Sequence, residues 1–387
     1  MNVTVLGGGM VGSAIVRDLS SDPAFSVTVA DRDRSALDRC AAAATAVKTL
    51  QADLADPDAL GGVIAEADLV IGAVPGFMGF ETLRRVIDAG KNVVDISFFP
   101  EDPFTLDTLA RERGVTAVMD CGLAPGLGNI LMGRLNEELD DIDTFLCYVG
   151  GLPVVRRKPY EYAAVFSPID VIEEYTRPAR YIENGSEVVR PALSDIEEMD
   201  FDGIGTLEAF NTDGLRSLAV TMHAPNMKEK TMRYPGHVAL MKALRDTGFF
   251  DKEAIDIAGQ RIAPLDFTAR LLFPAWEMKE GEEDLSVMRV IIEGRRGATV
   301  QRHTFDLLDR YDRVTGVTSM ARTTGYTCAV AARLVADGSY RHAGISPPEF
   351  LGARADVYNA LMAGLAARGI AFTHHMEETT KTPGHEE

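Results

Sequence analysis

Basic residues are scarce in this chain relative to acidic ones. There are 39 lysines and arginines against 58 aspartates and glutamates, which gives a net charge of −19 at pH 7, and no basic tract occurs. Nucleic acids are bound through clustered cationic side chains that neutralise phosphates, so we expect no nucleic-acid partner. The acidic surface is instead compatible with a soluble protein that weakly attracts cationic small molecules.

Cysteine is also rare, and the four cysteines are far apart. They are Cys40, Cys121, Cys147 and Cys328, which form no CxxC pair. Neither HExxH nor any Cys/His spacing typical of a metal site is present, so we expect no bound metal. The pattern predicts reduced thiols in an intracellular protein.

Long apolar runs are absent as well. No stretch approaches the roughly 20 apolar residues that span a membrane. The first strand pattern begins at Val3, which leaves no room for a signal peptide, so we expect a cytoplasmic protein with no membrane partner. The 387 residues, 46% hydrophobic and 25% charged, are enough for two domains with separate cores.

A glycine-rich motif stands at the start of the chain. Gly7, Gly9 and Gly12 follow an apolar strand pattern and precede an amphipathic helix pattern. In a dinucleotide-binding loop, the first glycine permits a tight turn, the second lets the backbone approach a pyrophosphate, and the third permits close helix packing. Met10 and Val11 then lie in the first turn, whose N–H groups face the phosphates. We predict a dinucleotide-binding domain.

Asp31 indicates which dinucleotide is bound. It ends the second predicted strand, about twenty residues beyond the last glycine, where a carboxylate accepts hydrogen bonds from ribose and repels a 2′-phosphate. NAD is therefore favoured over NADP. Arg32 beside it could receive a 2′-phosphate or belong to a solvated turn. Asp53 could reach the adenine side of the cofactor or cap the helix before Pro57.

Six strand patterns alternate with helix patterns up to Asp120, and this alternation predicts a doubly wound parallel sheet, an α/β fold, in residues 1–125. Ligands of such sheets bind at the carboxyl ends of the strands. We therefore expect the residues at these strand ends to surround the nicotinamide. They are Ala73, Val74, Pro75, Asp95 and Asp120.

The pattern changes after residue 125. Residues 126–319 show two-residue alternation broken by turns and by a few helices, which predicts an α+β substrate or dimerisation domain on a mainly antiparallel sheet. Residues 320–370 are predicted to be helical and to return to the first domain. The polar segment 374–387 is predicted to be a disordered tail.

Several segments in collinear order resemble the saccharopine dehydrogenase-like superfamily, most closely lysine 6-dehydrogenase. Besides Gly7–Gly12, they include APGLGN (124–129), YVGGLP (148–153), PYEYAAVFS (159–167), LEAFNTDG (207–214), KTMRYPGH (230–237) and MARTTGYT (320–327). The resemblance implies a homodimeric, NAD-dependent enzyme that oxidises L-lysine at its ε-carbon and releases ammonia. Saccharopine dehydrogenase using NAD(P) is the alternative, and a non-catalytic NAD sensor is a further one.

Two departures in these segments bear on the substrate. Saccharopine reductases of the superfamily typically have an acidic residue in GLDPG, where this chain has Ala124, and their PLGYKFSWSP is replaced by PYEYAAVFSP. Both departures argue against saccharopine as the substrate.

The chemistry requires a neutral amine, and the matching segments supply candidate residues. Lysine's amine has a pKa of about 10.4, so deprotonation at neutral pH costs about 4–5 kcal/mol, which a base or desolvation must offset. The candidate bases are Asp120, Tyr160, Glu161 and His237. The candidates for substrate binding are Arg233, which could hold an α-carboxylate in bidentate fashion, with Lys230, Tyr148 and Gly150. For His237, the alternative is a histidine of the core. For Arg233 and Lys230, the alternative is a position on a solvated edge strand.

Overall fold

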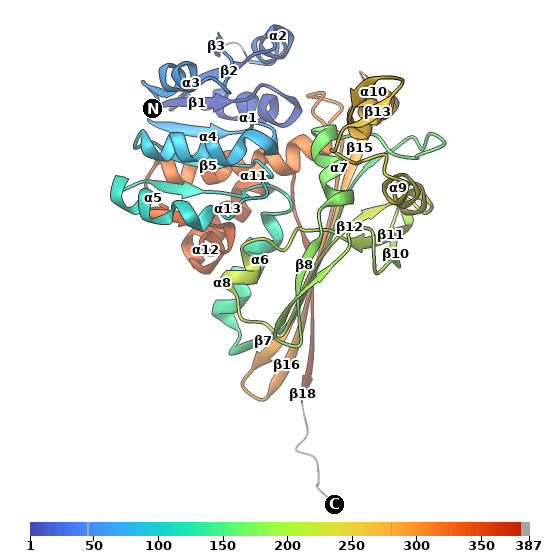
Figure 1. The fold of residues 1–387 in the computed structure, drawn as a ribbon. Helices are drawn as coiled ribbons and strands as arrows, with labels where there is room; N and C mark the ends of the chain where they lie inside the picture. Colours follow the sequence, from blue (N-terminus) through green and yellow to red (C-terminus); the bar gives the residue numbers. More distant parts are fainter. Residues whose placement is uncertain (45, 280, 381–387) are drawn as a thin grey trace, which may run out of the picture. The chain divides into compact units, whose positions relative to one another are not determined.

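A computed structural model of the chain describes residues 1–44, 46–279 and 281–380. Its contacts divide the chain into two compact units: residues 1–137 with 320–371, and residues 138–319 with 372–380 (Figure 1). We call them the dinucleotide unit and the substrate unit. The first boundary lies at residue 137 rather than 125, because helix α6 (Leu127–Glu138) packs on α12 (Pro348–Ala353) through Asn129 and Glu349.

The dinucleotide unit is built on a seven-stranded parallel sheet, and the predicted doubly wound fold is confirmed. The strand order is β17-β6-β5-β4-β1-β2-β3. The strands are β1 (Asn2–Leu6), β2 (Ser26–Asp31), β3 (Lys48–Gln51), β4 (Leu69–Gly72), β5 (Asn92–Asp95), β6 (Thr116–Val118) and β17 (Gly344–Ser346). The sequence patterns predict the first six; β17 comes from the returning C-terminal segment and pairs with β6.

Helices cover both faces of this sheet. One apolar cluster joins strand residues to helices α3 (Pro57–Ile64), α4 (Gly76–Asp88) and α5 (Asp107–Arg113), the last preceded by a 3-10 turn (Pro103–Leu106). Helices α1 (Met10–Ser20), α2 (Arg34–Ala43), α11 (Ser319–Ala336) and α13 (Ala355–Ala366) complete the unit. The central strand β4 (LVIG) is apolar and buried throughout, as expected when both faces of a parallel sheet are covered.

The substrate unit contains a nine-stranded, mostly antiparallel sheet, in agreement with the predicted α+β domain. Its main order is β10-β11-β12-β7-β15-β16-β18, with β8 beside β12 and β9, and only the β12–β7 pair is parallel. The strands are β7 (Asp141–Pro153), β8 (Ala179–Glu183), β9 (Ser186–Arg190), β10 (Glu197–Phe201), β11 (Gly205–Asn211), β12 (Asn226–Arg233), β15 (Asp284–Arg296), β16 (Thr299–Arg310) and β18 (Thr373–Thr380).

Two apolar clusters lie on this sheet. One joins helices α7 (Pro168–Thr176), α9 (His237–Asp246) and α10 (Pro264–Trp276) through Tyr175, Met241 and Trp276. The other is formed largely by strand residues, including Leu152, Met232 and Val287. The unit also has a short helix α8 (Leu218–Thr221) and a separate hairpin of β13 (Ile255–Ile257) and β14 (Gln260–Ile262).

The C-terminal segment differs from its prediction. Disorder is predicted from residue 374, but residues 373–380 form strand β18, which pairs antiparallel with β16. Its polar composition suits an edge strand, where Gln301 of β16 donates a hydrogen bond to Glu378. Residues 381–387 of the predicted tail lie outside the described residues.

Candidate functional site

The glycine loop joins β1 to α1, and two of its glycines are required by the fold itself. Gly7 has a φ of +107°, and a Cβ placed there would lie 2.3 Å from the carbonyl oxygen of Ala73. A Cβ on Gly12 would lie 2.0 Å from the carbonyl oxygen of Gly7. Both distances are far below any allowed contact, so neither position accepts a side chain without moving the backbone.

Gly9 differs from these two glycines. Its φ of −64° is available to any residue, and a Cβ placed there would meet no atom within 4 Å. It is exposed, and it is the N-cap of α1, with no side chain capping the first turn and no acidic residue in that turn. Met10 is 41% exposed and Val11 is half-buried. The free N–H groups and the positive end of the helix dipole form an open cradle for an anion.

Asp31 lies at the end of β2, beside this loop. Its Oδ2 accepts a hydrogen bond of 2.7 Å from the backbone N–H of Gly8, and its Oδ1 accepts one of 2.8 Å from Asp33. The carboxylate therefore supports the loop, and each oxygen still has a lone pair for a ribose hydroxyl. Arg32 is exposed beside it.

Asp53 is exposed in the loop after β3, where its Oδ1 accepts a hydrogen bond from the backbone N–H of Ala55. It is not the cap of the following helix. That role belongs to Asp56, whose side chain accepts from the N–H groups of Asp58 and Ala59. Asp53 therefore remains a candidate contact on the adenine side.

The other strand-end residues lie along the carboxyl edge of the same sheet. Ala73 and Val74 follow β4, and Pro75 is the N-cap of α4. Asp95 ends β5, is completely buried, and accepts hydrogen bonds from the backbone and side chain of Ser97. Asp120 follows β6 with a φ of +54° and is also buried. The topology thus brings the predicted cofactor residues to one edge of the sheet.

In the substrate unit, Arg233 is at the centre of a buried hydrogen-bond network. Its Nη2 binds a carboxylate oxygen of Glu174 at 2.7 Å, its Nε donates to the hydroxyl of Tyr175 at 3.3 Å, and its Nη1 donates to the carbonyl of Met232. The hydroxyl of Tyr175 lies 2.9 Å from Nε2 of His237, and Nδ1 of His237 lies 2.9 Å from the carbonyl oxygen of Tyr160.

The donors and acceptors of this network have only one consistent direction. The carbonyl of Tyr160 can only accept, so Nδ1 of His237 carries the proton and Nε2 accepts from Tyr175. Burial raises the pKa of Tyr175 to about 12, which keeps its hydroxyl protonated. Burial also raises the pKa of Glu174, an effect that Arg233 opposes. Both ring nitrogens of His237 are thus occupied, which fits a core histidine better than a base.

Aromatic rings surround this network. Tyr162 lies under the guanidinium of Arg233 at 4.7 Å, and its ring centroid is 5.4 Å from that of Trp276. The hydroxyl of Tyr162 and the indole N–H of Trp276 are buried and have no hydrogen-bond partner among the described residues. The sequence does not single out Glu174, Tyr175 and Trp276 as members of this site. The signal in the sequence is the pair Glu173 and Glu174, which lies near the end of the helix pattern that becomes α7.

Protonation of His237 provides a test of the network. Burial, reinforced by the charge of Arg233, lowers the pKa of His237 to about 3. In the unfolded chain histidine has a pKa of about 6.5, so below that pH the unfolded state takes up a proton that the folded state does not. We expect this residue to lower the free energy of unfolding by about 2 kcal/mol between pH 7 and pH 5.

Urea unfolding followed by the fluorescence of Trp276, the single tryptophan, measures this change. His237→Asn, which retains a donor toward the carbonyl of Tyr160, should lack that part of the pH dependence. An identical pH dependence in the wild type and this variant would show that His237 is not held neutral.

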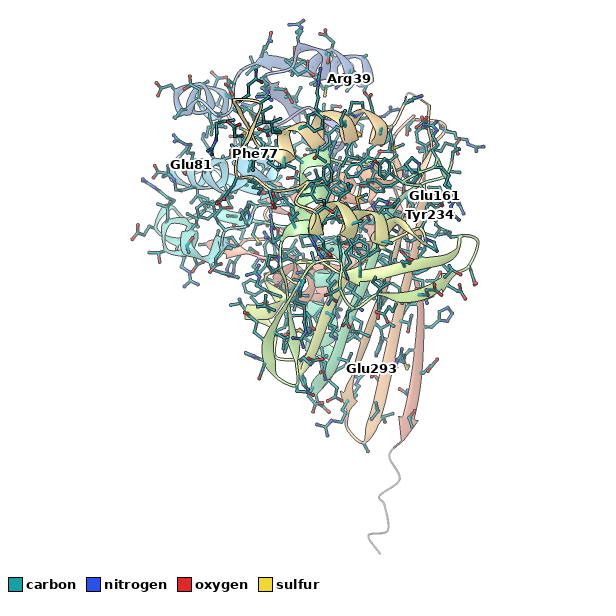
Figure 2. All side chains as sticks on the ribbon, turned by 45° about the vertical axis from the view of Figure 1, so that its right-hand side comes forward. Arg39, Phe77, Glu81, Glu161, Tyr234 and Glu293 are labelled. Carbon is teal, nitrogen blue, oxygen red and sulfur yellow. The ribbon has the colours of Figure 1, made fainter. Side chains whose placement is uncertain are left out.

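Glu161 is engaged by cations. Its carboxylate forms ion pairs with Arg156 and Lys158, and hydrogen bonds from Lys158 and then Arg156 lower its pKa. Figure 2 labels Glu161 close to Tyr234, whose ring lies 4.4 Å from the Arg156 guanidinium carbon. A carboxylate stabilised in this way is a weak base, so the arrangement does not favour the predicted role opposite a reacting amine.

Lys230 belongs to a different group of residues. Its Nζ donates to the carbonyl of Asp195 at 2.6 Å and pairs with Glu197 at 2.7 Å, and Tyr148 is its cross-strand partner. Because Lys230 and Arg233 are three residues apart on one strand, their side chains project from opposite faces of the sheet. The predicted substrate residues therefore do not form a single cluster.

Gly150, the remaining predicted substrate residue, lies on β7. A Cβ there would be 2.8 Å from the carbonyl oxygen of Met232, so close packing between neighbouring strands explains this glycine. Among the residues that the structure describes, no helix combines the length and the apolarity that crossing a membrane requires.

Known proteins resemble this chain over nearly its whole length. It is 26% identical to saccharopine dehydrogenase (NADP(+), L-glutamate-forming) of Pyricularia oryzae, covering 90% of this chain and 93% of the relative. It is 24% identical to the enzyme of that name from Saccharomyces cerevisiae, with the same coverage. The bovine mitochondrial alpha-aminoadipic semialdehyde synthase is 22% identical over 96% of this chain, which spans 47% of that longer protein.

A solved structure and two family models agree with this likeness. The apo saccharopine dehydrogenase (L-Glu forming) structure from Saccharomyces cerevisiae superposes with a TM-score of 0.78 at 21% identity, covering 97% of this chain and 99% of that one. Residues 3–118 match the saccharopine dehydrogenase NADP binding domain, and residues 122–370 match the saccharopine dehydrogenase C-terminal domain. Since the two models together cover nearly all of it, the chain belongs to the saccharopine dehydrogenase family.

Proposed function

We propose that this protein is an oxidoreductase that uses a nicotinamide dinucleotide to oxidise or reduce a C–N bond of an amino acid, with saccharopine as the first candidate substrate. The observation that carries this proposal is Gly9. No contact among the described residues requires a glycine there, yet the position lies at an uncapped helix N-terminus that is open to an anion. The saccharopine dehydrogenases among its relatives favour saccharopine over free lysine.

Lysine is the second candidate, because one position in the chain favours it. Ala124 stands where saccharopine reductases of the superfamily typically have an acidic residue, and it is half-buried in the turn between Gly122 and Gly126. An acidic group available to a larger substrate would therefore be missing at this position. Oxidation of lysine at its ε-carbon remains the alternative that this substitution supports.

For the cofactor, we infer NAD rather than NADP. The carboxylate of Asp31 is held at the end of β2 by two backbone N–H groups, so it cannot turn away without releasing Gly8. Its negative charge disfavours a 2′-phosphate. The nearby Arg34 is paired with Asp38 at 3.0 Å, which reduces its availability for a phosphate. The NADP(+)-dependent relatives argue the other way, so the two cofactors must be compared directly.

The chain's own residues would bind and orient the reactants. Gly7–Gly12 and Asp31 fit the pyrophosphate and ribose, and the bound nicotinamide would supply hydride transfer. Glu161 is neutralised by two cations and His237 has both nitrogens occupied, so neither is favoured as the base. Asp120, buried at the carboxyl edge of the sheet, is the carboxylate that we assign to proton transfer.

Absorbance of the reduced nicotinamide at mildly alkaline pH tests this function. Purified protein is incubated with NAD or NADP and, separately, with saccharopine, L-lysine or L-ornithine. A signal with saccharopine and NAD supports the first candidate, and a signal with lysine alone replaces it with the second. A higher kcat/KM with NADP than with NAD would overturn the cofactor inference. No turnover in any combination, with the dinucleotide still bound, would contradict an enzymatic role.

A further inference from the structure

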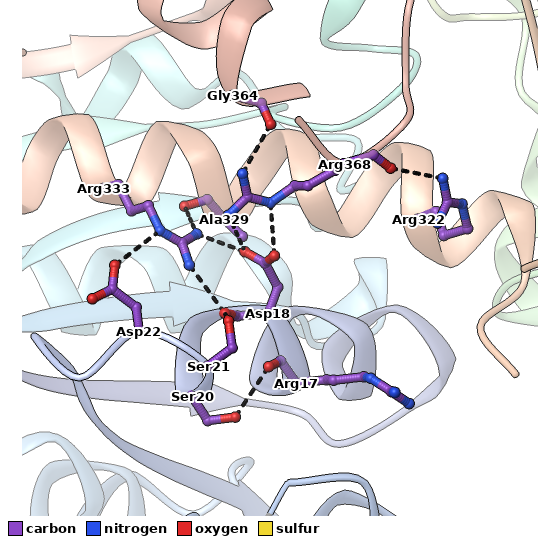
Figure 3. Close-up of polar contacts among 10 residues, drawn as sticks. All are labelled: Arg17, Asp18, Ser20, Ser21, Asp22, Arg322, Ala329, Arg333, Gly364 and Arg368. Carbon is purple, nitrogen blue, oxygen red and sulfur yellow. Dashed lines mark hydrogen bonds and ion pairs between the residues drawn. The ribbon is translucent and has the colours of Figure 1, made fainter. Parts of the chain in front are cut away.

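The helix that follows the glycine loop is bound at its far end by two arginines from the other end of the chain. Asp18, in the last turns of α1, pairs with Arg333 of α11 at 2.6 Å and with Arg368, after α13, at 2.6 and 3.1 Å (Figure 3). Arg333 also donates to the backbone carbonyl of Asp18 at 3.0 Å and pairs with Asp22 at 3.4 Å. We call Asp18, Arg333 and Arg368 the α1 clamp.

The clamp residues are largely shielded from solvent and held in position by further contacts. The side chain of Asp18 is only 10% exposed, and those of Arg333 and Arg368 are 20% and 21% exposed. Arg333 donates to the carbonyl of Ala329, and Arg368 donates to that of Gly364. Because the guanidinium groups are already oriented, the ion pairs lose less side-chain entropy than exposed pairs do and are less screened by salt.

A second contact joins the same two helices near the glycine loop. A Cβ on Gly325 of α11 would lie 3.2 Å from the carbonyl oxygen of Val11 and 3.4 Å from the Cβ of Ala14. Val11 and Asp18 are two turns apart on α1, and Gly325 and Arg333 are about two turns apart on α11. Helix α11 therefore supports α1 both beside its first turn and at its C-terminal end.

The charges of the clamp also suit the helix dipole. The C-terminal end of α1 carries partial negative charge, which two guanidinium groups stabilise. The opposite end offers free N–H groups to an anion. A shift or fraying of α1 would move those N–H groups, because a helix transmits displacement along its axis.

We propose that Asp18, Arg333 and Arg368 are positioning residues for dinucleotide binding, acting through the orientation of α1 rather than by touching the ligand. This inference rests on the dinucleotide binding that the proposed function requires. It predicts that breaking the clamp weakens binding of the dinucleotide about tenfold and leaves the KM for the amino acid, measured at saturating dinucleotide, unchanged.

The test compares Asp18→Asn with Asp88→Asn, using NADH and NADPH titrations by nicotinamide fluorescence well below the melting temperature. Asp88 is a matched control because its pair with Arg113 lies in the same unit, is half-exposed and does not involve α1. We expect a tenfold higher Kd for Asp18→Asn, a Kd within twofold of the wild type for Asp88→Asn, and substantial recovery in Asp18→Glu. Hydrogen exchange of the amides of residues 13–16, the first amides of α1 that are hydrogen-bonded within the helix, should be faster in Asp18→Asn.

The outcomes separate this inference from the proposed function. If Asp18→Asn lowers the melting temperature but keeps both the wild-type Kd and wild-type exchange at residues 13–16, the clamp has only a general structural role. If the wild type binds neither NADH nor NADPH, the proposed function fails, and the exchange data alone decide whether the clamp positions α1. Arg368→Gln, which leaves the Asp18–Arg333 pair in place, provides a milder variant if Asp18→Asn does not fold.

Discussion

Replacing Gly9 by alanine is expected to raise the Kd for the dinucleotide at least about a hundredfold while leaving the stability of the protein unchanged. The new Cβ would meet no atom of the chain within 4 Å and would sit on an ordinary backbone conformation. It would instead occupy the space that a pyrophosphate needs to reach the N–H groups of α1. Losing two charge-assisted hydrogen bonds costs about 3 kcal/mol, which corresponds to a hundredfold change in Kd.

Two other glycine-to-alanine variants are the controls. Gly61→Ala changes an exposed helical glycine that also has open space around it, so both Kd and stability should be unchanged or slightly improved. Gly12→Ala places a Cβ 2.0 Å from the carbonyl oxygen of Gly7, so it should lower the melting temperature as well as binding. Titration with NADH and thermal unfolding distinguish the three variants. Wild-type affinity in Gly9→Ala would remove the loop from the cofactor site.

Replacing Arg233 by methionine is expected to destabilise the substrate unit by about 3 kcal/mol. The Arg233 side chain is 3% exposed, and its guanidinium has partners in Glu174, Tyr175 and Met232. Removing it leaves the carboxylate of Glu174 mostly buried without its cation, and breaking a buried pair in this way typically costs about 3–5 kcal/mol. Urea unfolding followed by the fluorescence of Trp276, which lies in the cluster around the network, measures the loss.

Arg113→Met is the matched control for this variant. Arg113 and Asp88 are each half-exposed, so removing this ion pair should cost less than about 1 kcal/mol. The double variant Arg233→Met with Glu174→Leu should regain part of the stability, because no unpaired carboxylate remains. If Arg233→Met is no less stable than the control, the network does not stabilise the unit.

The variant Arg233→Met also tests whether Arg233 binds substrate. Three of its five N–H donors are engaged by Tyr175, Met232 and Glu174, so substrate binding would have to use the others. A strongly raised KM for the amino acid, measured on the folded fraction, would support the predicted role. An unchanged KM would restrict Arg233 to holding the network together.

The dinucleotide unit could be predicted from the sequence because its signals are local. The spacing of Gly7, Gly9 and Gly12, the carboxylate of Asp31 at a strand end and the alternation of strands with helices together predict the parallel sheet and its carboxyl edge. The predicted superfamily is confirmed for the same reason, since these segments keep their order along the chain. Strand β17 was missed because three residues are too few for a recognisable period.

The substrate unit depended much more on tertiary structure. Whether Arg233 and Lys230 share a site depends on whether both lie in one regular strand. The structure places both in β12, where a spacing of three residues puts their side chains on opposite faces. Similarly, Glu161 is paired with Arg156 and Lys158 through a local loop conformation that no periodicity indicates. The polar composition of the segment from residue 374 predicts disorder. The segment nevertheless forms the edge strand β18, because β16 supplies its backbone hydrogen-bond partners and an edge strand needs little apolar character.

The sequence by itself therefore determined the glycine loop and the fold class, since both follow from residues that are close together along the chain. Only the tertiary structure decided which polar side chains meet. Glu174 and His237 join Arg233 from separate elements, and Arg333 and Arg368 reach Asp18 from more than 300 residues away. Such contacts depend on how elements pack against one another, which no local pattern of residues specifies.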